Sequence, residues 1–358
     1  MKVFRCDHCR QLVFFENVRC VACGHALAFL PDLGVVGSLD PAAGGTFTTP
    51  IARAATPYRL CANYVGNDVC NWAVPAADHD PLCRACRLTR VIPDLDPPGN
   101  REKWYKVEVA KRRLLYTLMA LKLPTATKDE DAAGGLAFEF KADPADPAAP
   151  RVLTGHADGV ITLNIAEADD AERERVRAHF GEPYRTLVGH FRHESGHYYW
   201  DRLVKDSPRL DAFRAAFGDE RADYGAALTA HHANGPAADW RDRFVTAYAS
   251  VHPWEDWAET WAHYLHMVDS LETAAACGVR LRPPRAGDPA LRTIPDPVDD
   301  EFEPFDELMA SWYPLTYLLN NLNRGLGLPD GYPFVLSTPA VEKLRFIHDT
   351  IWAARGVA

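Results

Sequence analysis

The cysteines constrain the fold of this chain more than any other feature. Eight of the nine lie before residue 90, in two groups of four: Cys6, Cys9, Cys20 and Cys23, then Cys61, Cys70, Cys83 and Cys86. In the first group two Cys-x-x-Cys pairs stand ten residues apart, a spacing that predicts four thiolates around one tetrahedral ion. Residues 1–32 are therefore expected to form a zinc ribbon, although thiolates alone leave iron open as the metal.

The second cysteine group contains one close pair, Cys83 and Cys86, and predicts a second structural zinc site, with His79 as an alternative ligand. A disulfide framework would suit a small secreted domain without a core, whereas this chain has 358 residues. Gly, Pro, Ala and Thr dominate the stretch after Gly34, so residues 33–98 are expected to hold a linker and the second zinc-binding segment. The lone Cys277 is expected to be a small buried hydrophobe.

Charge and hydropathy exclude several classes of function. The net charge of −10 argues against a protein that grips nucleic acid, because such binding needs a basic surface. Residues 1–35 hold four Lys/Arg against three Asp/Glu, so the ribbon is expected to recruit a protein partner instead. No stretch approaches the roughly 20 apolar residues of a membrane span, and the first residues lack the apolar core of a signal peptide. We therefore expect a cytoplasmic protein without membrane contact.

A long amphipathic helix is expected to begin near Asn100, a plausible N-cap. Apolar residues recur at helical spacing from Trp104 to Leu121. Lys and Arg residues lie between them, and this basic face, with Lys111, Arg112 and Arg113, is expected to be solvated surface and not a binding patch.

The rest of the chain predicts a small sheet followed by helices. Residues 136–140 and 160–165 have the pattern of strands, and the second is expected to be an edge strand that aligns a peptide substrate. Beyond residue 168 almost every segment has a helical pattern. Residues 99–358 are therefore expected to form one α+β domain that is mostly helical.

The motif His-Glu-x-x-His occurs at His193, Glu194 and His197, within an aromatic and aliphatic helical stretch. Residues four apart share one face of a helix, so both imidazoles can bind one zinc ion. Glu194 lies about 100° further around the helix, where it can take a proton from a water at the open position of the metal. We therefore predict a catalytic zinc with Glu194 as general base.

A third ligand is expected from a second helix that begins near Pro253. Glu255 and Glu259 share one face of this helix, and two carboxylates beside tryptophans are costly to bury unless something positive compensates them. Glu255 is predicted to bind the zinc, while Glu259 accepts the outer N–H of a ligand histidine. His263 and His266 further along are expected to be structural.

These motifs resemble those of the gluzincins, and still more closely those of the anthrax lethal factor-like catalytic domains. In the latter, a tyrosine seven residues before the ligand glutamate stabilises the oxyanion, which implies the same role for Tyr248. The whole chain is similar to a bacterial family of zinc-binding metallopeptidases with an N-terminal zinc ribbon. The resemblance implies a zincin-like fold. The chain departs from thermolysin-like enzymes in having Glu259 where they have Asp, and in a longer insertion between His197 and Glu255.

The leading functional hypothesis is therefore a zinc metallopeptidase that acts on a peptide or protein substrate, with one catalytic and two structural zinc ions. Two alternatives share the same residues. One is a catalytically idle scaffold whose ribbons recruit protein partners, which the intact Glu194 disfavours. The other is a zinc hydrolase of non-peptide amides.

Overall fold

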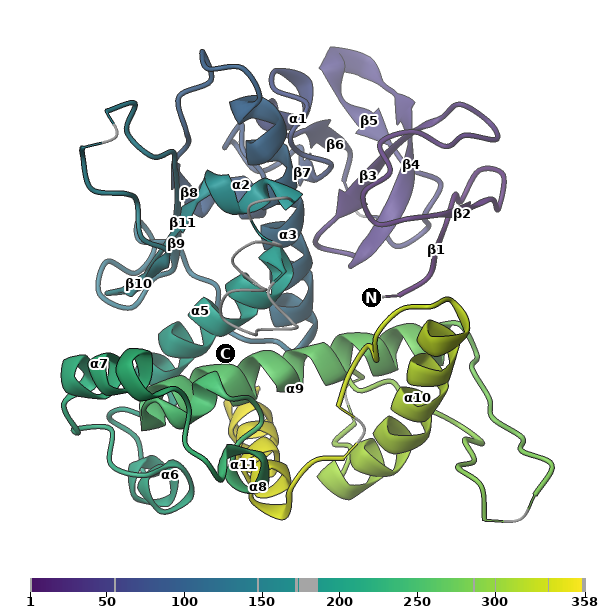
Figure 1. Ribbon diagram of the computed structural model, residues 1–358. Helices are drawn as coiled ribbons and strands as arrows, with labels where there is room; N and C mark the ends of the chain where they lie inside the picture. Colours follow the sequence, from purple (N-terminus) through teal and green to yellow (C-terminus); the bar gives the residue numbers. More distant parts are fainter. Residues whose placement is uncertain are drawn as a thin grey trace. The chain divides into compact units, whose positions relative to one another are not determined.

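The computed structural model describes residues 2–54, 56–146, 148–170, 173, 186–285, 287–299, 301–333 and 335–355 of the chain. Contacts divide it into two compact units, whose helices and strands are labelled in Figure 1. The N-terminal unit consists of Val3–Ala120 and Pro124–Phe191, and the C-terminal unit of Met1–Lys2, Leu121–Leu123 and Arg192–Ala358. The border that we expected at residue 98 falls inside the N-terminal unit.

The N-terminal unit begins with a short hairpin of β1 (Phe4–Arg5) and β2 (Leu12–Val13), followed by an antiparallel sheet. The sheet has the order β3 (Ala26–Leu30), β4 (Val35–Pro41), β5 (Phe47–Thr48), β6 (Tyr58–Leu60), β7 (Ala73–Pro75), with η1 (Ala43–Gly45) before β5.

This five-stranded sheet includes the stretch that we expected to be a linker or an irregular segment. β4 and β5 lie within it, and Leu39 of β4 packs in the core with Leu30, Tyr58 and neighbouring residues. Gly37 belongs to this packing, because a Cβ there would meet Leu30 Cδ1 at 2.8 Å. Small residues in this stretch thus allow close packing between strands, and the segment is part of the folded body.

Two short helices follow cysteines of the second group. α1 (Ala62–Val65) begins after Cys61, and α2 (Arg84–Arg87) begins after Cys83. The four cysteines of this group are buried.

In the long helix α3 (Asn100–Ala120), two residues of the basic face are buried, so our expectation that this face is solvated surface is wrong for them. Lys111 and Arg112 are 0% and 1% exposed, and Lys111 Nζ lies 2.9 Å from Oε2 of the buried Glu108. Burial alone would lower the pKa of Arg112, but the negative charges of Cys70, Glu108 and Cys86 raise it. These cations are therefore counter-ions of the second cysteine group, whereas Arg113 keeps a side chain that is 44% exposed.

A four-stranded sheet completes the N-terminal unit, in the order β10 (Gly155–Ala157), β11 (Val160–Asn164), β9 (Ala137–Lys141), β8 (Thr89–Val91). The short η2 (Ile165–Ala168) follows β11. β9 runs parallel to both of its neighbours. The strand predicted at residues 160–165 is present as β11, but it lies inside the sheet, whose edge strands are β10 and β8.

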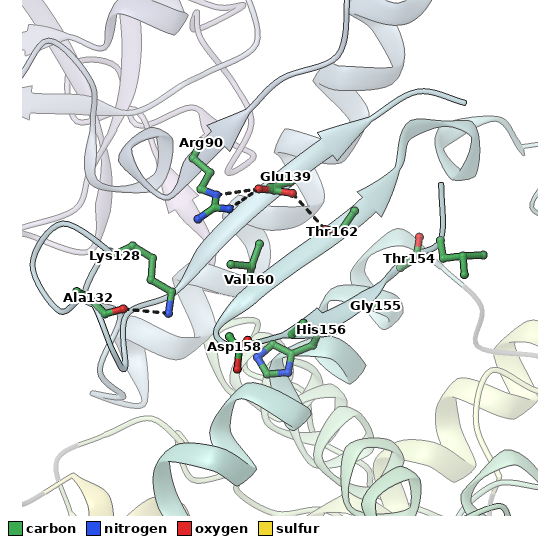
Figure 2. A pocket seen from close by; sticks show the side chains of 12 residues that line it. Arg90, Lys128, Ala132, Glu139, Thr154, Gly155, His156, Asp158, Val160 and Thr162 are labelled. Carbon is green, nitrogen blue, oxygen red and sulfur yellow. Dashed lines mark hydrogen bonds and ion pairs between the residues drawn. The ribbon is translucent and has the colours of Figure 1, made fainter. Parts of the chain in front are cut away.

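The two faces of this sheet differ. Phe138 and Phe140 point to the buried side, where both rings meet Phe191. The other face borders an open pocket of about 810 Å³, shown in Figure 2. In it Glu139 is held by Arg90 at 2.7 Å, and also pairs with Lys141 at 2.6 Å.

The described part of the C-terminal unit is built of helices. They are α5 (Leu187–Leu203, from Arg192 onward), α6 (Leu210–Phe217), α7 (Tyr224–Asn234), α8 (Trp240–Arg243), η3 (Tyr248–Ser250), α9 (Pro253–Ala276), α10 (Phe305–Gly325) and α11 (Thr338–Ala354). α9 is the central element, contacted by α6, α10 and α11, and its Trp257 and Trp261 are fully buried. The mixture of a sheet-containing unit with this helical unit is the α+β class that we expected.

Cys277, just after α9, is exposed, so our expectation of a buried hydrophobe is wrong. Among the helices that the structure describes, none combines the length and apolarity that crossing a membrane requires.

Candidate metal centre and active site

The two motif helices α5 and α9 touch through their backbones. A Cβ on Gly196 would lie 2.9 Å from the Cα of Ala258, so only glycine permits this approach. Trp257 Nε1 donates to the Gly196 carbonyl at 2.8 Å, and Trp261 Nε1 donates to Ser195 Oγ at 3.2 Å. The glycine inside the His-Glu-x-x-His motif therefore allows the contact that brings the α9 carboxylates to the α5 histidines.

His193, His197 and Glu255 converge at this contact. Nε2 of His193 lies 3.2 Å from Nε2 of His197 and 3.1 Å from Oε2 of Glu255. One ligand atom from each residue lies within 4.8 Å of the others. His197 and Glu255 are 4% and 2% exposed. Two imidazole nitrogens and a carboxylate oxygen are the donors that a catalytic zinc takes, so this site fits a zinc ion with one position left open.

Glu259 supports this site from one turn further along α9. Its Oε1 lies 2.7 Å from Nδ1 of His193, while its Oε2 accepts a hydrogen bond from Thr246 Oγ1 at 2.7 Å. A carboxylate at Nδ1 keeps a proton there and leaves the Nε2 lone pair for a metal. The structure thus places Glu255 at the cluster and Glu259 behind His193.

The charges in the cluster are strongly coupled. Burial opposes the ionisation of Glu255, but His197, His193 and the hydroxyl of Tyr224 lower the pKa of this carboxyl to about 2. Burial also opposes protonation of His193, yet Glu255 and Glu259 raise its pKa well above the ordinary value. The carboxylates therefore stabilise positive charge at this point, which a divalent cation would supply.

The two predicted catalytic residues also lie in the C-terminal unit. Glu194 follows His193 on α5 and is 8% exposed. Tyr248 lies in η3, with its ring centroid 6.1 Å from that of His193. Glu194 is thus next to the cluster along the chain, and Tyr248 is near it in space.

Tyr224 was missed by our sequence reasoning. It is the first residue of α7, and its hydroxyl donates to Glu255 Oε1 at 2.8 Å. Nothing in its local sequence signals this contact beyond Asp223, whose side chain caps α7 by accepting from the Ala226 N–H.

Other polar residues near the motifs have structural partners. His263 contacts the hydroxyl of Tyr332, and His266 Nδ1 lies 3.5 Å from a nitrogen of Arg192. Burial lowers the pKa of His263 to about 4 and that of His266 to about 3. His263 is buried and His266 is half-buried, and both take part in the packing of α9.

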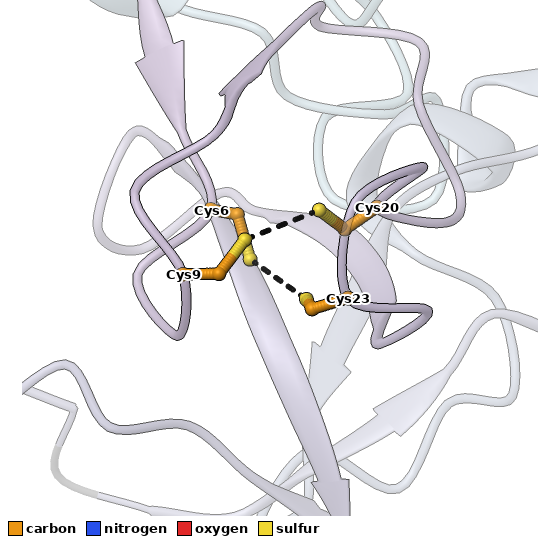
Figure 3. A group of neighbouring side chains, drawn as sticks. All are labelled: Cys6, Cys9, Cys20 and Cys23. Carbon is orange, nitrogen blue, oxygen red and sulfur yellow. Dashed lines mark hydrogen bonds between the residues drawn. The ribbon is translucent and has the colours of Figure 1, made fainter.

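The first cysteine group is gathered by the hairpin and the turn before β3 (Figure 3). Sγ of Cys6 lies 3.7 Å from Cys23, and Sγ of Cys9 lies 3.6 Å from Cys20. Thiolates bound at about 2.3 Å to one tetrahedral ion are about 3.8 Å apart, whereas a disulfide needs about 2.0 Å. The four sulfurs therefore fit a metal ion and are not disulfide-bonded.

The second group is arranged in the same way. Cys61, Cys70, Cys83 and Cys86 have sulfurs within 4.8 Å of one another, and Cys70 lies 3.7 Å from Cys83. His79 is not part of this cluster. The four cysteines alone can thus complete a closed tetrahedral site.

Comparison with known proteins adds an independent line of evidence. Residues 100–350 match the sequence model of a family described as "Putative zinc-binding metallo-peptidase", and residues 3–97 match that of a zinc-ribbon domain. One protein of Mycobacterium bovis and proteins of two Mycobacterium tuberculosis strains, each described as an uncharacterized protein, are 42% identical to the chain over 352 residues. The alignment covers 98% of this chain and 95% of each relative. No solved structure matches the chain.

The first of these matches includes both motif helices and the cluster between them. With two cysteine groups in front and a His, His, Glu site behind, the chain belongs to the zinc-binding metallo-peptidase family and carries an N-terminal zinc-ribbon domain.

Proposed function

We propose that this protein is a gluzincin-type metallopeptidase that hydrolyses peptide bonds at the cluster of His193, His197 and Glu255. The observation that carries the proposal is the convergence of these three ligand atoms next to Glu194, a nearly buried carboxylate with no place in the ligand set. A purely structural zinc site would be closed by a fourth protein ligand.

Each residue has a defined task in this proposal. When bound, zinc polarises the scissile carbonyl and lowers the pKa of a water at its open position. Glu194 takes the proton from the attacking water and passes it to the leaving amine. Tyr248 donates a hydrogen bond to the carbonyl oxygen as negative charge develops there. Glu259 keeps His193 in the tautomer that binds metal.

The decisive experiment compares the zinc-loaded protein with Glu194→Gln. Both are incubated with a peptide library from a cell lysate, and new termini are read by mass spectrometry. We expect new termini from the parent protein only, and Glu307→Gln, an exposed acid on α10, should cleave like the parent. A parent protein that holds zinc but produces no new termini would favour the idle scaffold, or a hydrolase of other amides.

We also propose that the first ribbon recruits the protein substrate. In the β1–β2 hairpin Phe4 and Val13 face inward, while Leu12 and Phe14 are 53% and 78% exposed. Val21 on the second cysteine turn is 88% exposed. Exposed apolar side chains of this kind are typical of sites that bind another polypeptide.

The charges around this outward face indicate an acidic partner. Asp7 is turned inward to the Ser38 N–H at 2.6 Å, and Glu16 is paired with Arg113 at 2.6 Å. Arg5 and Arg10, by contrast, are exposed. We therefore expect an acidic segment with apolar side chains to bind here.

A double substitution, Leu12→Asp with Phe14→Asp, tests this recruitment. It should reduce cleavage of intact proteins and leave cleavage of short synthetic peptides unchanged. Val65→Asp, at a site 68% exposed on α1, serves as the control. Equal loss on both substrate types, or on neither, would contradict a recruiting role.

A further inference from the structure

The hydroxyl of Tyr224 distinguishes the two oxygens of the ligand Glu255. It donates to Oε1 at 2.8 Å, whereas Oε2 lies 3.1 Å from Nε2 of His193. A carboxylate oxygen that accepts a strong hydrogen bond is the poorer metal ligand, because part of its electron density is already engaged. Oε2 is thus left as the donor that faces His193, while Oε1 lies 3.6 Å from Nε2 of His197.

The placement of Tyr224 depends on features of α7 and α9. Asp223 caps α7 and fixes the position of its first residue, Tyr224. His252 caps α9, its Nε2 lies 3.1 Å from the Ala222 carbonyl, and its ring lies 5.4 Å from the Tyr224 ring. The beginnings of the two helices are therefore tied together next to Glu255.

We propose that Tyr224 is a positioning residue, which makes Glu255 a metal ligand through one oxygen. The role at Glu255 concerns metal binding alone, and only its consequence for an attacking water rests on the proposed peptidase function. By holding Oε1, Tyr224 would keep the second carboxylate oxygen out of the position that this water would need when zinc is bound.

The test uses Tyr224→Phe, with Tyr248→Phe and Tyr264→Phe for comparison. Tyr264 is the control, because its buried hydroxyl also has a polar partner, Nδ1 of His348 at 3.0 Å, and it lies on α9, the helix that bears Glu255. Zinc affinity is measured by competition with a chelator, and the visible spectrum of the cobalt-substituted protein reports the number of ligands. Both readouts are independent of catalysis.

For Tyr224→Phe we expect zinc affinity to fall by about 10- to 100-fold, as for other lost partners of metal ligands, and the cobalt spectrum to weaken as the carboxylate binds through both oxygens. Tyr248→Phe should leave affinity and spectrum unchanged but lower kcat with little change in KM. Tyr264→Phe should change none of these quantities.

The outcomes separate the inference from the proposed function. If Tyr224→Phe has the affinity and spectrum of the parent protein, the positioning role at Glu255 is wrong, whatever the activity. If the metal readouts change as expected but no variant or parent cleaves peptides, the peptidase function fails while the positioning role stands.

Discussion

Nδ1 of His193 lies 2.7 Å from Oε1 of Glu259, on the side of the ring away from the other ligand atoms. Because of this contact, replacement of the two α9 glutamates should have different effects on zinc binding. Glu255→Ala removes a ligand and should abolish tight zinc retention at this site. Glu259→Ala keeps three ligands but frees the His193 ring, so affinity should fall by about 10- to 100-fold. Chelator competition measures both, and a larger loss for Glu259→Ala would reverse the assignment.

Zinc binding should release protons at neutral pH. Because Glu255 and Glu259 raise the pKa of His193, this residue is protonated near pH 7 in metal-free protein and must lose a proton to bind zinc. Affinity should therefore increase as the pH rises towards that pKa. Calorimetric titration in two buffers of different ionisation enthalpy measures the release, and Glu255→Ala supplies the background from the cysteine sites. Identical heats in both buffers would contradict the prediction.

Replacement of Gly196 by alanine should disturb both stability and metal binding. The new Cβ would lie 2.9 Å from the Ala258 Cα and 3.2 Å from the Trp261 Cβ, so α5 and α9 must separate. We expect a loss of about 1–3 kcal/mol in the free energy of unfolding, together with weaker zinc binding. Denaturant titration measures the first quantity. Gly325→Ala is the control, because a Cβ there has no atom within 4 Å.

The charge of Arg112 should matter far more than that of its neighbour Arg113. Arg112→Met removes a buried cation beside the second cysteine group, and unbalanced buried charge costs about 3–5 kcal/mol. Arg113→Met breaks only a partly exposed pair with Glu16 and should cost less than about 1 kcal/mol. Hydrogen exchange along α3 reports the difference. Equal protection in the two variants would show that Arg112 is not a counter-ion of the site.

Metal analysis should find three zinc ions per chain in protein purified without chelator, one for each ligand set. One zinc or fewer would contradict both cysteine assignments.

Removal of the second cysteine site should unfold more of the chain than its N-terminal part. Cys61→Ser is expected to weaken α3 and the sheets, because they form one compact unit with this site.

The residues of the metal cluster could be predicted because they follow local rules. The four-residue spacing of His193 and His197, and the capped start of α9 before Glu255, are properties of single helices. Tyr224 could not be found in this way, because its contact with Glu255 depends on where α7 lies against α9. No periodicity within one segment contains that information.

The fold likewise contains features that local sequence patterns do not predict, because they depend on distant segments. The basic residues Lys111 and Arg112 look like solvated surface in a helical pattern, and their burial is explained by the buried Glu108 together with the neighbouring cysteine thiolates. The strands β4 and β5 were not predicted, because their segment is rich in glycine and proline. Such a composition is typical of a loop, but here it occurs in a closely packed sheet. In both cases the partner that decides the structure lies far away along the chain.

The close contact of Gly196 with Ala258 has a consequence for substrate selection. Two helices that touch through their backbones cannot slide apart to admit a larger ligand, so the wall that bears the zinc ligands is rigid. α7 and α8, which the structure describes in full, have no buried residue. Tyr224 at the start of α7 is held to Glu255, so under the proposed function any adjustment to different substrate side chains would fall to the rest of α7 and to α8, and not to the helices that carry the zinc ligands.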